Sequence, residues 1–187
     1  MTEEYITEQD LASQLNVSRT PLREAMSELI NENLIEFKPR KGYRVKEYSK
    51  DEIEQIFSLR KLIELAIIPS LLTKCDKEGL NSLKNIIKEQ EDCLKKHDNY
   101  NFMTLDKSFH RQMFLISERN IFLQSYDVFH NLTIFIGSQV IKQKGRMEEV
   151  IQEHQEIVNS LEEKNKEKLE QSINKHLITT QKLYIDK

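Results

Sequence analysis

The chain has 187 residues, of which 32% are charged and 38% are hydrophobic, with no Trp, four Gly and three Pro. This length suits one medium domain or two small ones, and the composition is typical of a helix-rich globular protein. The net charge of -3 is close to neutral, so charge alone does not indicate nucleic acid or a membrane surface as a partner.

Neither a membrane span nor an export signal is predicted. The longest apolar run, residues 62–72, is interrupted by Glu64 and Pro69 and is too short to cross a bilayer. The first residues lack the basic and apolar regions of a signal peptide. Cys75 and Cys93 match no metal or redox spacing, and we expect them to be reduced thiols. We therefore expect a cytoplasmic protein with no membrane partner.

Residues 1–48 predict a helix, a tight turn, a second helix and a short hairpin. Thr7 followed by Asp10 resembles a capping box at the start of the first helix. Ser18 is a good N-cap for the second helix, and Pro21 is tolerated in its first turn. The buried stripe of the second helix is Leu22, Ala25, Met26, Leu29 and Ile30.

The hairpin is predicted as strands at 34–37 and 43–46 around a KPRKG turn. Side chains alternate along a strand, so we expect one face to hold Ile35, Phe37, Tyr43 and Val45. Two helices joined by a tight turn match the helix-turn-helix motif, in which the second helix enters the major groove of DNA.

Basic residues cluster where such a motif would meet DNA. Arg19, Thr20 and Arg23 lie early on the second helix, where Arg can bond guanine edges or phosphate and Thr can bond phosphate. The hairpin tip carries Lys38, Arg40, Lys41 and Arg44, which suits a wing on the DNA backbone. Residues 1–48 hold seven Lys/Arg against nine Asp/Glu. The alternative is therefore a solvated basic turn beside a surface helix.

The segment from Ile6 to Ser49 resembles the winged-helix domain of GntR-family transcription regulators. VSRTPLREAM, the LI that follows it and the KG before the last strand carry the resemblance. The resemblance implies a double-stranded DNA operator as partner. It also implies DNA contacts by Ser18, Arg19, Thr20, Arg23 and the wing residues Arg40, Lys41 and Gly42.

Two departures from the family pattern follow. Members of the family have a further helix before this segment, and its absence here would leave Leu11, Leu15 and Leu29 partly uncovered. Many members also carry Arg where this chain has Gln9, so one DNA contact of the family is missing. We therefore expect a partial winged helix, lacking its usual first helix.

From Ser49 onward the pattern is helical throughout. Ser49 with Glu52 predicts a capping-box start, and Pro69 is expected to kink the helix that contains it. The predicted helices are 50–74, 77–96, 99–116, 119–143, 146–162 and 166–185. The fold class is thus mostly α, with a winged helix-turn-helix domain at 1–48 and an all-α bundle at 49–187.

Four ionisable residues lie on apolar stripes of these helices. Asp106 and His110 are one turn apart, so they point the same way. His154 and His176 interrupt the stripes of the last two helices, eleven residues before and after the predicted turn at Asn165. If those helices pack antiparallel, the two imidazoles meet at one depth.

Burying these four groups unpaired would be costly, and a divalent metal would satisfy them together. Three imidazoles and a carboxylate suit Zn, Ni, Mn or Fe, and an open coordination position would accept a small carboxylate. The alternative is that each His is a hydrogen-bonded core residue. His97 and His130 have no such context and are interpreted as ordinary surface or core residues.

Residues 49–187 resemble the FCD ligand-binding domain of the FadR subfamily, in its shorter six-helix form. SLRKLIE, LDKSFH, the Asn120 position and EHQEIV with the later His176 carry the resemblance. It implies Asp106, His110, His154 and His176 as metal ligands below a pocket for a small organic acid. It also places Arg60 and Asn120 near that pocket, although Arg60 could instead pair with Glu64 and Asn120 could simply start a helix. Arg146 is a further candidate for the pocket.

The sequence thus predicts a homodimeric transcription regulator, not an enzyme, that responds to an effector bound beside a metal. A metallohydrolase is an alternative, because such a metal can activate water. It lacks a separate general base like the Glu of H-E-x-x-H. A second alternative is a regulator remnant that keeps its metal but no longer binds DNA.

Overall fold

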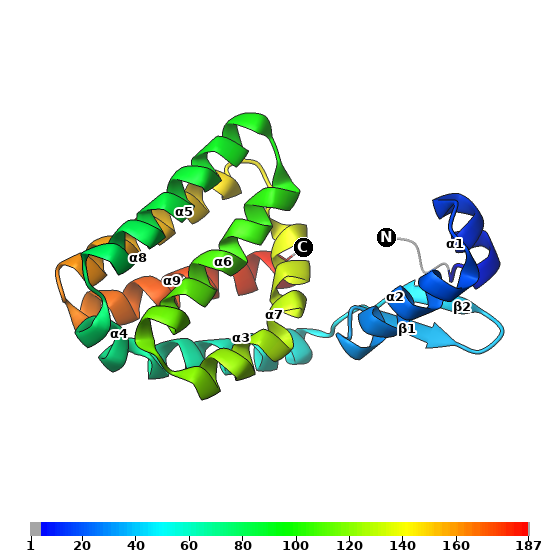
Figure 1. The fold of residues 1–187 in the computed structure, drawn as a ribbon, viewed down its shortest axis with the longest axis horizontal. Helices are drawn as coiled ribbons and strands as arrows, with labels where there is room; N and C mark the ends of the chain where they lie inside the picture. Colours follow the sequence, from blue (N-terminus) through cyan, green and yellow to red (C-terminus); the bar gives the residue numbers. More distant parts are fainter. Residues whose placement is uncertain (1–4, 187) are drawn as a thin grey trace. The chain divides into compact units, whose positions relative to one another are not determined.

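The computed structural model describes residues 5–186, and the chain divides between Tyr48 and Ser49 into two compact units. Figure 1 shows a small unit of helices with a hairpin and a larger unit made only of helices. The fold is therefore mostly α, as predicted, and each unit is described by itself.

The small unit contains α1 (Glu8–Leu15), α2 (Arg19–Asn31), β1 (Ile35–Lys38) and β2 (Gly42–Val45). The Thr7 hydroxyl accepts the Asp10 N–H at 3.2 Å, which confirms the predicted N-cap of α1. Ser18 precedes α2 in the N-cap position, but its side chain makes no capping hydrogen bond.

The hairpin has the predicted face, although each strand is shifted by one residue from the predicted 34–37 and 43–46. Ile35 pairs with Val45 and Phe37 with Tyr43, so these four side chains share one face. The unit's core is small: Ala12, Leu22, Met26 and Tyr43 are its buried apolar residues. Leu11 and Leu29 are only partly buried, and Leu15 is 57% exposed.

The large unit contains seven helices within the described residues. They are α3 (Lys50–Ala66), α4 (Ile68–Lys74), α5 (Lys77–Lys96), α6 (Asn99–Ser117), α7 (Asn120–Val140), α8 (Arg146–Glu162) and α9 (Lys166–Ile185). The predicted helix at 50–74 is divided at Ile67 into α3 and α4. Pro69 explains the division, because it lacks the N–H that would continue the hydrogen-bond ladder.

The packing of these helices encloses one interior. α6 packs against α4, α5 and α7, whereas α9 packs against α3, α4, α7 and α8 (Figure 1). α8 also packs on α5. The inward faces of α6, α8 and α9 line the same part of the core. None of the helices described here has the length and hydropathy to cross a membrane.

Candidate functional site

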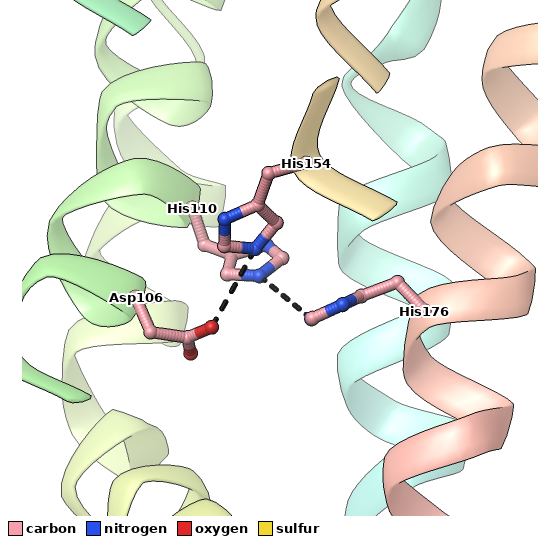
Figure 2. A group of neighbouring side chains, drawn as sticks. All are labelled: Asp106, His110, His154 and His176. Carbon is pink, nitrogen blue, oxygen red and sulfur yellow. Dashed lines mark hydrogen bonds and ion pairs between the residues drawn. The ribbon is translucent and has the colours of Figure 1, made fainter. Parts of the chain in front are cut away.

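Four side chains meet inside the helical unit. Figure 2 shows Asp106 and His110 projecting from α6 toward His154 on α8 and His176 on α9. All four are buried, and one ligand atom from each lies within 4.8 Å of the others. The residues expected from spacing on three helices are therefore brought together in space.

Each imidazole is held from behind through its Nδ1 atom. The partners are Glu64 Oε2 for His110 at 2.9 Å, Glu153 Oε2 for His176 at 2.8 Å and Gln90 Oε1 for His154 at 2.9 Å. Because carboxylate and amide oxygens accept, each Nδ1 donates its proton to this partner. The Nε2 atom of a neutral imidazole then carries a lone pair, and it is the Nε2 atoms that face the centre.

The contact between His110 and His176 shows which kind of group the centre could hold. Their Nε2 atoms lie 3.1 Å apart. With both Nδ1 atoms protonated, two lone pairs face each other and repel. His154 Nε2 is 3.5 Å from Asp106 Oδ1 and makes no hydrogen bond with any described residue. A divalent cation held by these nitrogens and by Asp106 would turn these unfavourable contacts into ligand bonds.

The protonation states match this role. Burial alone would raise the pKa of Glu64, but the facing His110 and Arg60 outweigh it and lower the pKa to about 2. Burial lowers the pKa of His110 despite the attraction of Glu64. Burial, with the nearby His176 and His110, lowers the pKa of His154 well below its ordinary value. These pKa shifts favour neutral imidazoles at His110 and His154 and an ionised Glu64, the forms that bind a metal and support its ligands.

The sequence interpretation missed three of these supporting residues as site residues: Glu64, Glu153 and Gln90. The spacing of four residues indicates Glu64 only as a partner of Arg60. Glu153 lies seven residues after Arg146, on the same helical face, which is a signal that sequence alone could have provided. Gln90 carries no comparable signal, because its contact with His154 spans 64 positions and depends on the packing of α5 on α8.

A cavity adjoins the cluster. Its polar lining consists of Arg60, Asp106, Thr133, Arg146, His176 and Thr180, and Met103, Gly137, Val140, Ile141 and Val150 complete its wall. Its free space is about 20 Å3, which is room for about one water molecule. Gly137 matters here because a Cβ at this position would lie 2.5 Å from Met103 Cε.

The three residues expected at the effector pocket are placed differently. Arg60 and Arg146 are buried and line the cavity. Arg60 also forms the expected intrahelical pair, with its Nε 2.6 Å from Glu64 Oε1. Asn120 is exposed at the first position of α7 and does not line the cavity, so the fold does not bring it to this site.

The residues expected to read DNA lie on the surface of the small unit. Ser18, Arg19, Thr20 and Arg23 are exposed at the start of α2. The Arg23 side chain is 66% exposed, and its Nε donates to Glu8 Oε2 at 2.8 Å. A phosphate would have to compete with this carboxylate.

The wing residues lie at the turn of the hairpin. Arg40 and Lys41 are exposed at its tip, with Arg40 at a φ of 67°. Gly42 is instead buried, at a φ of 106°, and a Cβ there would lie 2.1 Å from the Ile6 carbonyl oxygen. Gly42 therefore shapes the wing by letting Ile6 bond to Tyr43, while Arg40 and Lys41 present the charge.

A winged helix-turn-helix unit followed by an all-α bundle defines a class of DNA-binding transcription regulators with a separate helical domain. Family comparisons agree. Residues 1–45 match the bacterial regulatory proteins of the gntR family, and residues 55–179, more than half of the chain, match the FCD domain. The chain belongs to the GntR family, is a DNA-binding transcription regulator, and carries the FCD domain of the FadR-like subfamily.

Individual relatives align with most of the chain. The HTH-type transcriptional regulator YdhC of Bacillus subtilis is 26% identical over 180 residues, which cover 92% of this chain and 78% of YdhC. The HTH-type transcriptional repressor RspR of Escherichia coli is 22% identical over 175 residues, covering 92% of this chain and 75% of RspR.

Solved structures show the same fold. A putative GntR transcriptional regulator from Rhodococcus sp. RHA1 superposes with a TM-score of 0.79 at 18% identity, covering 97% of this chain and 87% of that one. McbR/YncC of Escherichia coli gives a TM-score of 0.76 at 19% identity, covering 97% and 86%.

Proposed function

We propose that this regulator binds a divalent metal through Asp106, His110, His154 and His176, and that a small carboxylate effector binds beside the metal to control DNA binding. One observation carries the proposal. Three buried imidazoles, each with its Nδ1 held from behind, direct their Nε2 atoms at one point beside Asp106. At this point the buried Nε2 atom of His154 has no hydrogen-bond partner among the described residues.

Zn, Ni, Mn and Fe are the metals that fit three imidazoles and one carboxylate. The bound metal supplies a Lewis-acidic position that a carboxylate oxygen can occupy. The residues of the chain supply the rest: they fix the ligand orientations, bury the site, and line the adjoining cavity with two guanidinium groups, those of Arg60 and Arg146. A guanidinium N–H suits a carboxylate because it makes a charge-assisted hydrogen bond.

The free space of about 20 Å3 sets a limit on the effector. Even a small acid can enter this space only if the wall moves, and Met103 is the flexible part of the wall that can move aside. A substitution that restricts the movement of this wall, such as Gly137→Ala, should therefore abolish effector binding.

On DNA, Arg19, Thr20 and Arg23 are proposed to enter the major groove from α2, with Ser18 at the groove edge and the wing at Arg40 and Lys41 on the backbone. Such regulators read two half-sites when they are dimers, and a homodimer is part of the proposal. Its contact surface is proposed on α3 and α7, which pack together. α7 exposes Ile121 (73%) and Val128 (82%), two turns apart on one face.

Native mass spectrometry, compared with the denatured mass, tests the proposal. We expect a dimer with one metal per chain, and monomers from Val128→Glu. Electrophoretic mobility shifts with the upstream DNA of the protein's own gene would test operator binding. A metal-free mass with no uptake of added Zn, Ni or Mn would contradict the metal site. Metal uptake without DNA binding would favour the remnant alternative.

A further inference from the structure

Both arginines of the cavity are only partly paired. Arg60 donates through Nε to Glu64, but its buried Nη2 has no hydrogen-bond partner among the described residues. Arg146 donates through Nη1 and Nη2 to Glu153 at 3.0 and 2.8 Å, through Nη1 to the exposed Glu149 at 3.2 Å and through Nη2 to Thr180 at 3.1 Å. Its buried Nε has no partner in the same part of the chain. A buried N–H without an acceptor is costly, so each arginine has a place for an anionic ligand atom.

The glutamates on these arginines are the ones that hold two of the metal-facing imidazoles. Glu64 bonds Arg60 through Oε1 and His110 through Oε2. Glu153 bonds Arg146 through both oxygens and His176 through Oε2. We call Arg60–Glu64–His110 and Arg146–Glu153–His176 the two relays. His154 differs, because its Nδ1 partner is the neutral Gln90.

The charges of this buried group favour ordered occupancy. Among the buried side chains, two guanidiniums lie with three carboxylates, those of Glu64, Asp106 and Glu153. Glu149 also pairs with Arg146, but its side chain is 58% exposed and screened by water. With the imidazoles counted in the uncharged form that binds a metal, the buried groups carry one net negative charge. This charge repels an anion. A divalent cation reverses the sign and leaves one net positive charge, which a single carboxylate neutralises.

Building on the proposed function, we propose that Arg60 and Arg146 are positioning residues that couple two binding events. A monocarboxylate bound in the cavity tightens metal binding at the histidines, and the bound metal tightens carboxylate binding. When a carboxylate draws the unpaired N–H of an arginine, the arginine bonds its glutamate less strongly. The glutamate then accepts more strongly from the imidazole Nδ1–H, which makes that imidazole a better metal ligand. Linkage requires the reverse effect to be equal.

Acetate and Zn²⁺ are suitable probes for the full-length protein. The dissociation constant of Zn²⁺ is measured by chelator competition with and without excess acetate, corrected for the zinc that acetate binds in solution. We expect acetate to tighten Zn²⁺ binding about tenfold, within the range usual for coupled sites. Arg60→Lys and Arg146→Lys keep the positive charge but lose the planar fork. Each should reduce the coupling severalfold, where the coupling is the ratio of the Zn²⁺ dissociation constants of the same variant without and with acetate, so that any change in its basal Zn²⁺ affinity cancels.

Arg111→Lys is the matched control. Arg111 lies on α6 next to His110 and makes two bonds to Asp127, at 3.0 and 3.1 Å, but it belongs to neither relay and does not line the cavity. Its coupling should equal that of the unmodified protein. If all three lysine variants kept the coupling of the unmodified protein, the proposal would be overturned, since acetate would then act only by direct contact with the metal.

A second measurement needs no substitution. In Zn²⁺-loaded protein labelled with ¹⁵N-histidine, acetate should move the Nδ1–H signals of His110 and His176 downfield, because their acceptors strengthen. The signal of His154 should stay in place, because Gln90 is outside both relays. Equal movement of all three signals, or of none, would contradict the relays. Failure of the unmodified protein to bind Zn²⁺ at all would instead contradict the proposed function.

Discussion

Arginine pairs with glutamate in both units of this regulator, and the two pairs differ in their surroundings. In the DNA-binding unit, Arg23 lies 2.8 Å from Glu8 with a largely exposed side chain. In the helical unit, Arg60 lies 2.6 Å from Glu64 and both side chains are buried. Water screens the exposed Arg23–Glu8 pair and can hydrogen-bond either partner if the pair separates. Water cannot do this for the buried Arg60–Glu64 pair. An exposed arginine can therefore leave its partner for a phosphate, while a buried one fixes the groups around it.

The largest effect is expected when the buried pair is broken. Arg60→Ala should lower the free energy of unfolding by about 3–5 kcal/mol, because Glu64 remains buried without its counter-charge. Urea denaturation of the metal-free protein measures this loss. Arg23→Ala, the same change at the exposed pair, is the control and should leave the free energy of unfolding nearly unchanged. Similar losses in the two variants would show that burial does not distinguish the pairs.

The second effect concerns the metal. His154→Ala and His176→Ala should each lose the metal and the stability that it adds. At a metal concentration of about 1,000 Kd, that stabilisation is about 4 kcal/mol in the unmodified protein. Metal analysis and thermal unfolding with and without a chelator test this prediction. His97→Asn is the control, because His97 is exposed at the left-handed C-cap of α5, where Asn is tolerated. Unchanged metal content in both alanine variants would refute the site.

DNA binding should respond to the exposed pair instead. Arg23→Ala is expected to weaken operator binding about tenfold or more, as the loss of a base-edge contact does, with metal content unchanged. Fluorescence anisotropy with labelled operator DNA measures the loss. Lys95→Ala is the control, since Lys95 is also exposed and paired, with Asp92 at 3.0 Å, but lies in the helical unit. Equal weakening by both variants would mean that only total charge matters.

The smallest effect is expected from Glu8→Ala. The stability should change by less than about 1 kcal/mol, because the pair is exposed. Operator affinity should stay the same or rise, since the carboxylate no longer competes for Arg23. Weaker DNA binding in this variant would show that Glu8 orients Arg23 toward the operator, and the exposed pair would then resemble the buried one more closely than we expect.

Local patterns in the sequence predicted most of the secondary structure. Helix boundaries follow caps and apolar periodicity, so the predicted bounds of α5, α6, α8 and α9 agree with the structure to within one residue. The division at Ile67 was predicted only as a kink, because the sequence shows that Pro69 breaks the hydrogen-bond ladder but not how the two parts pack. Asn120 was expected near the pocket by resemblance, and the fold leaves it exposed.

The sequence by itself determined which residues face inward: Asp106 and His110 share a helical face, and His154 and His176 lie at equal distances from one turn. These relations depend only on helical geometry, which is local. The tertiary structure decided what stands behind those residues. Glu64 reaches His110 across 46 positions and Gln90 reaches His154 across 64, and such contacts exist only because α3, α5, α6 and α8 pack as they do. The periodicity of side chains describes only the helix that carries them. Packing between helices therefore determines which partners orient each imidazole.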